Sequence, residues 1–122
     1  MAKKLLLVDD DVQLLRHTAD FIKDLNQGWE VDCAVSGMEA RGKVENKRRE
    51  EKDYDVILSD YEMSEINGID LRFYLQDLDF RGRFYLMSGA PIQKEILDVL
   101  GIDGFMNKPF SLPAIRKILE DA

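Results

Sequence analysis

The sequence predicts an α/β fold: a doubly wound (βα)5 sandwich, in which a five-stranded parallel sheet carries helices on both faces. Short apolar runs alternate five times with segments of helical periodicity along the chain. Parallel strands need helical crossovers, and right-handed crossovers place helices on both faces of the sheet. With 122 residues, 45% of them hydrophobic, the chain is long enough to bury a core. We therefore expect one domain over residues 1–122.

The expected strands are short apolar runs that end at or beside polar residues. They cover residues 3–9, 29–35, 54–60, 83–87 and 104–107. Helices are expected over residues 11–25, 69–78, 92–100 and 112–120, with a further helix after the second strand. That further helix should begin at Ser36, because the spacing of Ser36 and Glu39 matches a capping box.

Composition and charge exclude several classes of protein. The formal net charge of −7 argues against a nucleic-acid-binding surface, which would need a basic patch. No apolar stretch reaches the roughly 18 residues of a membrane span, and the first apolar run is too short for a signal peptide. The single cysteine, Cys33, forbids an internal disulfide and suits a reducing compartment. We therefore expect a cytoplasmic protein that binds neither nucleic acid nor membrane.

Polar residues gather at the carboxyl ends of the expected strands, an edge of the sheet that we call the carboxyl edge. In doubly wound sheets, ligands bind outside this edge, near the point where the strand order reverses. The residues expected there are Asp9, Asp10 and Asp11 after the first strand, Asp60 on the third, and Ser88 and Lys108 after the fourth and fifth. Crowded carboxylates repel one another unless a cation joins them. Mg²⁺ prefers such oxygen ligands and often has a phosphate as its partner.

The same residues could hold a phosphoryl group. Lys108 offers a positive charge and Ser88 offers a hydroxyl donor. A carboxylate can also act as the nucleophile and form an acyl phosphate. Asp60 is the expected nucleophile, because it stands alone on its strand whereas Asp9 and Asp10 are paired for a metal ion.

Four motifs extend these observations over essentially the whole chain. LLLVDDD, DVILSDYEMSEINGIDL, FYLMSGA and GFMNKPF, in that order, resemble the receiver domain of two-component response regulators. The resemblance implies a flavodoxin-like fold and a signalling switch that catalyses only its own phosphoryl transfer and dephosphorylation. It also implies that Asp60 is the phosphoacceptor and that Asp10 and Asp60 bind Mg²⁺ through their side chains. Asp9 would act largely through water, and Glu62 would contribute its backbone carbonyl.

The resemblance assigns further roles near the phosphoacceptor. Ser88 and Lys108 would hold the phosphoryl oxygens, and Ser88 would act with Phe105 as the conformational switch. A cis peptide bond is implied before Pro109. The implied phosphodonor is a sensor histidine kinase or a histidine phosphotransfer domain. The implied target is a downstream protein or an output domain. The chain could be either a stand-alone regulator or the N-terminal part of a longer protein.

The first helix offers a candidate docking surface for the phosphodonor. Its core stripe is expected at Leu14, Thr18, Phe21, Ile22 and Leu25. Val12, Leu15 and Ala19 lie beside that stripe at helical spacing and close to the carboxyl edge. An exposed apolar patch beside an active site often marks a partner surface. We therefore expect these three residues to be exposed and to contact the histidine-bearing domain.

Two other functions remain open. The chain could be a pseudo-receiver, an interaction module that is never phosphorylated. It could also be a Mg²⁺-dependent phosphatase of the haloacid dehalogenase type, with a nucleophile in the Asp9–Asp11 segment. That chemistry needs a further acidic pair after Lys108, where only Glu120 and Asp121 follow, and it leaves Asp60 without a role.

Overall fold

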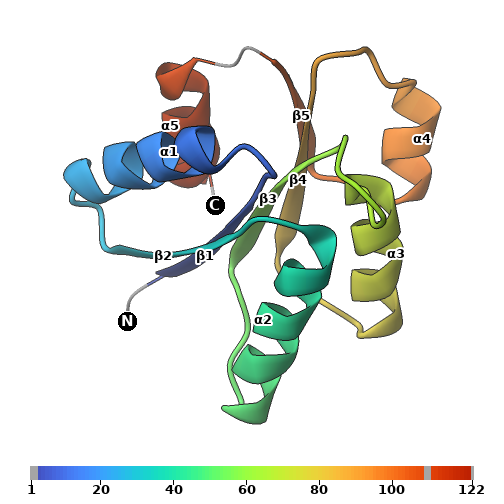
Figure 1. Cartoon of the computed structure of the whole chain (residues 1–122), viewed down its shortest axis with the longest axis horizontal. Coiled ribbons are helices and arrows are strands. Elements are labelled where there is room, and N and C mark those ends of the chain that lie inside the picture. Colours follow the sequence, from blue (N-terminus) through green and yellow to red (C-terminus); the bar gives the residue numbers. More distant parts are fainter. Residues whose placement is uncertain (1–2, 109–110, 122) are drawn as a thin grey trace.

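The computed structural model describes residues 3–108 and 111–121. Five parallel strands form one sheet in the order β2-β1-β3-β4-β5, with helices on both faces (Figure 1). The strands are β1 (Lys3–Val8), β2 (Trp29–Ala34), β3 (Val56–Asp60), β4 (Arg83–Ser88) and β5 (Gly104–Asn107). The helices are α1 (Val12–Asp24), α2 (Gly37–Arg49), α3 (Gly68–Asp77), α4 (Lys94–Val99) and α5 (Leu112–Asp121). The predicted fold class is therefore confirmed.

Most element boundaries lie within one or two residues of those expected, and local hydrogen bonds explain where the helices begin. Helix α2 starts as predicted, because the backbone N–H of Glu39 donates to Ser36 Oγ at 3.1 Å. Helix α4 is shorter than expected: it begins only at Lys94, and its N-cap residue Gln93 makes no side-chain capping bond. The peptide bond before Pro109, expected to be cis, lies outside the described residues.

The hydrophobic core consists of two layers, one on each face of the sheet. Alternate residues of a strand point to opposite faces. Leu5 and Leu7 accordingly pack with α1 and α5, whereas Leu6 and Val8 pack with α2 and α3. All five residues of β3 are buried, as expected for a strand covered on both faces.

The strand order places the polar residues of the carboxyl edge together. From β1 the chain first adds β2 on one side and then continues with β3 on the other, so the order reverses between β1 and β3. The residues that follow β1 therefore lie beside the end of β3, with Val8 paired to Ser59 in the register. This reversal is where doubly wound sheets bind their ligands.

The predicted docking patch on α1 is wrong in two of its three residues. Leu15 and Ala19 are buried in the core cluster beneath α1 and α5, and only Val12 is exposed. Thr18 and Ile22 are buried as expected, but the other buried residues of α1 are Leu15 and Ala19, so the buried face is turned toward these two residues. Phe21, which was expected in the core, is only partly buried at its margin. The described helices include none that is long and apolar enough to cross a membrane.

Candidate functional site

Three carboxylates meet at the carboxyl edge. Asp9, Asp10 and Asp60 each offer an oxygen atom, and these oxygens all lie within 4.8 Å of one another. Asp9 follows β1 and is 2% exposed, while Asp60 ends β3 and is 5% exposed. Asp10 is exposed to solvent. The sequence predicted this grouping, and the reversal of strand order is what produces it.

Lys108 places its ammonium group between two of these carboxylates. Its Nζ lies 2.9 Å from Asp9 Oδ2 and 3.2 Å from Asp60 Oδ1. The backbone N–H of Lys108 donates to the carbonyl of Ser88 at 2.8 Å, which fixes the residue beside the end of β4. Partial burial alone would lower the pKa of Lys108, but the hydrogen bond and charge of Asp9, followed by those of Asp60, raise it. Lys108 is therefore held in its charged form.

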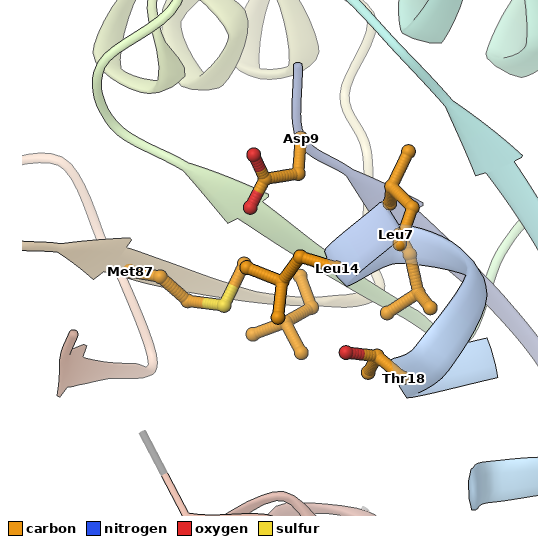
Figure 2. Close-up of a pocket in the computed structure, with 7 residues that line it drawn as sticks. Leu7, Asp9, Leu14, Thr18 and Met87 are labelled. Carbon is orange, nitrogen blue, oxygen red and sulfur yellow. The ribbon is translucent and has the colours of Figure 1, made fainter. Parts of the chain in front are cut away.

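Asp9 is fixed by polar contacts on one side and apolar side chains on the other. The backbone N–H of Asp11 donates to Asp9 Oδ1 at 3.0 Å. Below the carboxylate lies a small pocket lined mainly by apolar side chains of α1 and the sheet, including Leu7, Leu14 and Met87 (Figure 2). Water has little access to this side of Asp9. The contacts to Lys108 and Asp11 therefore replace the hydration that the buried charge has lost.

Asp60 has an unusual affinity for a proton. Burial, and secondly the charge of Asp9, raise the pKa of Asp60 to about 6, although Lys108 offsets part of the effect. One ammonium group thus does not fully neutralise the buried carboxylates. A divalent cation would complete the neutralisation, and the clustered carboxylate oxygens fit Mg²⁺ in their chemistry.

The remaining predicted residues occupy different positions around this cluster. Ser88 ends β4 and is fully buried, and its Oγ accepts a hydrogen bond of 3.0 Å from the backbone N–H of Ala90. The Ser88 hydroxyl proton is thereby left for another acceptor. Glu62 is exposed and lines an open depression together with Asp10. Phe105 lies on β5 and is partly buried against the cluster beneath α2 and α3.

Sequence reasoning missed a glycine that lets the chain pass close to Asp60. A Cβ atom on Gly68 would lie 2.6 Å from the backbone oxygen of Asp60 and 2.6 Å from Leu86 Cδ1. The backbone N–H of Gly68 also donates to the carbonyl of Tyr61 at 2.9 Å, which closes the loop after β3. A glycine at the first turn of the helix that follows the candidate nucleophile and its loop is the signal that could have revealed this contact.

Two helix caps near the site were also missed. Asn67 and Asp70 form both bonds of a capping box at the start of α3. Asp11 caps α1 by accepting a hydrogen bond from the backbone N–H of Leu14 at 3.1 Å. Asp11 thus has a structural role, although it stands in the same acidic run as Asp9 and Asp10. Both patterns were visible as acidic or amide residues placed just before periodic apolar segments.

Several known proteins are similar to this chain in sequence or fold. The probable transcriptional regulator ycf29 of Porphyra purpurea is 30% identical over 125 residues, which cover 99% of this chain and 56% of the relative. The chemotaxis protein CheY of Halobacterium salinarum is 28% identical over 124 residues, which cover 99% of this chain and 97% of CheY. A solved CheY-like receiver domain from Methanospirillum hungatei JF-1 superposes with a TM-score of 0.86 and 21% identity, covering 99% of this chain and 93% of that one. At that level of identity, the superposition shows the fold alone.

The matches cover nearly all of this chain but only part of most of the relatives. The chain spans about half the length of the transcriptional regulators that it matches. The family model described as "Response regulator receiver domain" matches residues 5–120, which include every candidate site residue. The chain therefore belongs to the response regulator receiver domain family.

Proposed function

We propose that residues 1–122 act as one receiver domain whose Asp60 accepts a phosphoryl group from a histidine-containing donor. The donor would be a sensor histidine kinase or a histidine phosphotransfer domain. Phosphorylation would change the contacts that the domain makes with a downstream protein or an output domain. In this proposal the chain is a signalling switch, and its only chemistry is its own phosphorylation and dephosphorylation.

One observation carries this proposal. The ammonium group of Lys108 contacts both Asp9 and Asp60 at the reversal point of the sheet, with Asp10 in the same cluster. Lys108 Nζ contacts Oδ1 of Asp60, so the other carboxylate oxygen is the one that we expect to attack phosphorus. After transfer, the same ammonium group would be placed to pair with a phosphoryl oxygen.

The proposed phosphoryl transfer needs only the two proteins, Asp60 as the acceptor and a phosphohistidine as the donor. An Asp60 oxygen forms a bond to the phosphorus of phosphohistidine, the P–N bond breaks, and its electron pair stays on the imidazole nitrogen. Dephosphorylation replaces the P–O bond to Asp60 by a bond to water. It yields inorganic phosphate and regenerates the carboxylate. The Ser88 hydroxyl, which is free to donate, and Lys108 would hold the phosphoryl oxygens in both steps.

Mg²⁺ is the cofactor that we propose for this site. Asp10 and Asp60 would bind it through their side chains, the backbone carbonyl of Glu62 would be a third ligand, and Asp9 would act largely through water. When bound, Mg²⁺ would supply positive charge for the phosphoryl oxygens. The proposed location is the cytoplasm, because a free cysteine such as Cys33 suits a reducing compartment.

Labelling with acetyl phosphate tests this function against its alternatives. The wild-type protein should gain one phosphoryl group in the presence of Mg²⁺, and Asp60→Asn should gain none. Absence of label in both proteins would favour a pseudo-receiver. Rapid turnover that survives in Asp60→Asn but is lost in Asp9→Asn would favour the phosphatase.

A further inference from the structure

An apolar groove lies between α3 and α4, which are neighbours at the right of Figure 1. Its lining consists of Ile69, Phe73, Glu95, Ile96, Val99 and Leu100, and the exposed surface inside it is almost wholly apolar. Phe73 is 53% exposed and Val99 is 81% exposed. Exposed apolar residues that are grouped in this way mark interaction surfaces more often than isolated ones do.

Two side chains of α3 bind the C-terminal end of α4 at one end of the groove. Arg72 Nε and Gln76 Nε2, both on α3, donate to the carbonyl of Leu100 at 2.8 and 2.9 Å. Gly101 follows with a φ of +63°, a conformation that ends α4. These bonds fix the C-terminal end of α4 against α3. A partner would therefore meet a preformed surface and would lose little affinity to its reorganisation.

Helix α4 is only partly covered: Leu97 packs against the core cluster beneath α2 and α3, but two other apolar residues do not. None of its six residues is buried, although it carries Ile96 and Val99. A surface helix normally buries one apolar stripe against its neighbours. Ile96 and Val99 are thus left exposed in the groove, where a second apolar helix could cover them.

The charges around the groove select the kind of partner. Asp70 and Asp77 lie three and four positions from Phe73 on α3, and Glu95 lies four positions from Val99 on α4, so each flanks an exposed apolar residue. All three acids are exposed. The basic residues of the two helices are Lys94 and Arg72, and Arg72 is engaged with Leu100. The surroundings of the groove are therefore acidic.

We propose that the α3–α4 groove binds an amphipathic helix of a partner protein, with an apolar stripe for Phe73, Ile96 and Val99 and with lysine or arginine residues on its flanks. A groove between two helices accepts the apolar face of a third, and opposite charges at the margin steer and orient it. A second copy of this chain is a poor occupant. A two-fold interface would place the acidic margin against itself.

Designed peptides test the proposal without knowledge of the natural partner. The probe is a helical peptide about 14 residues long, with leucines at helical spacing and lysines on both sides of the leucine stripe. The matched control peptide has glutamates in place of these lysines. Titrations followed by backbone amide shifts are done with Mg²⁺ present, so that the carboxyl-edge acids do not bind the lysines. The lysine peptide should shift residues of α3 and α4 and bind at least about tenfold tighter than the glutamate peptide.

Variants distinguish binding in the groove from nonspecific binding to exposed apolar residues elsewhere. Phe73→Ser with Val99→Ser should weaken binding of the lysine peptide about tenfold. The matched control is Met38→Ser on α2, where Met38 is 55% exposed, and it should leave binding unchanged. Asp77→Lys with Glu95→Lys should reverse the preference between the two peptides. Asp60→Asn should bind the two peptides as the wild type does, because the groove needs no phosphate. This result keeps the proposal separate from that of phosphorylation.

Three results would overturn the proposal. One is equal affinity for the two peptides, and another is a set of amide shifts that lies outside α3 and α4. The third is self-association of the protein through α3 and α4, seen as concentration-dependent shifts without peptide. That result would assign the groove to a second copy of the chain.

Discussion

The ammonium group of Lys108 donates a hydrogen bond of 2.9 Å to Asp9 Oδ2, although 99 positions separate the two residues. This bond joins the end of β5 to the end of β1 and neutralises a carboxylate that is almost fully buried. Lys108→Met should therefore destabilise the metal-free protein by about 3 kcal/mol, the usual cost of leaving a buried charge without its partner. Urea denaturation in a chelating buffer measures the loss. Lys117→Met, at an exposed position of α5, is the control and should cost little.

A loss in Lys108→Met no larger than that in Lys117→Met would show that Asp9 needs no ion pair. Addition of Mg²⁺ should recover part of the loss, because the cation can neutralise the same carboxylates.

Asp60 should make the stability of the metal-free protein depend on pH. Burial raises its pKa to about 6, whereas an unfolded aspartate titrates near about 3.9. The stability gained from the bound proton is thus complete below pH about 4 and is lost as pH rises through about 6. Wild type should lose up to about 3 kcal/mol relative to Asp60→Asn over that interval, corresponding to about two pKa units. Urea denaturation of both proteins in chelator, at a series of pH values, measures the difference. Parallel stability curves for the two proteins would contradict the raised pKa.

Mg²⁺ should stabilise the folded protein by mass action. At about one hundred times its dissociation constant, a ligand that binds only the folded state contributes about 2.7 kcal/mol. Asp10 is exposed, so Asp10→Asn should fold normally and yet lose most of this stabilisation. Asp11→Asn is the matched control, because asparagine caps a helix as well as aspartate does. Thermal unfolding with and without Mg²⁺ at constant ionic strength provides the measurement. Equal responses of the two variants would place the metal elsewhere.

Gly68 should be intolerant of a side chain although it lies in a helix. Gly68→Ala places a methyl group 2.6 Å from the backbone oxygen of Asp60, so the end of β3 or the start of α3 must move. We expect a cost of about 1 to 3 kcal/mol and slower labelling of Asp60. Gly42→Ala, on α2 with no atom within 4 Å of the new methyl group, should instead stabilise the protein by about 0.5 to 1 kcal/mol. Two glycine substitutions with the same sign and size would argue against the close contact.

The fold and the acidic cluster could be predicted from the sequence because both follow from short-range patterns combined with one topological rule. Apolar runs such as Val56 to Leu58 mark strands that are buried on both faces, and the carboxyl ends of parallel strands share an edge. The ion pair between Lys108 and Asp9 followed from the same rule only in outline. Which carboxylate the lysine contacts depends on side-chain geometry that no spacing reveals.

The error on α1 has a physical cause. Leu14, Phe21 and Leu25 repeat at helical spacing, and so do Leu15, Ala19 and Ile22, so the apolar sector is wide and its centre is ambiguous. Alanine and threonine at positions 19 and 18 suit the close approach of α1 to the sheet, while the larger Phe21 lies at the margin. Periodicity alone therefore predicted the helix and the burial of Thr18 and Ile22 correctly, but it missed the burial of Leu15 and Ala19. The exposed groove between α3 and α4 was likewise invisible, because it depends on how two separate helices are placed.

The most direct test of the whole account is to locate the phosphoryl group. The protein is labelled with acetyl phosphate and Mg²⁺ and then treated with borohydride, which reduces an aspartyl phosphate to homoserine. Peptide mass spectrometry then identifies the modified position. We expect homoserine at position 60 and at no other aspartate, with none formed when Mg²⁺ is replaced by chelator. Homoserine at position 9 or 10, or a wild-type protein that is not reduced at any position, would contradict the assignment of Asp60 as the phosphoacceptor.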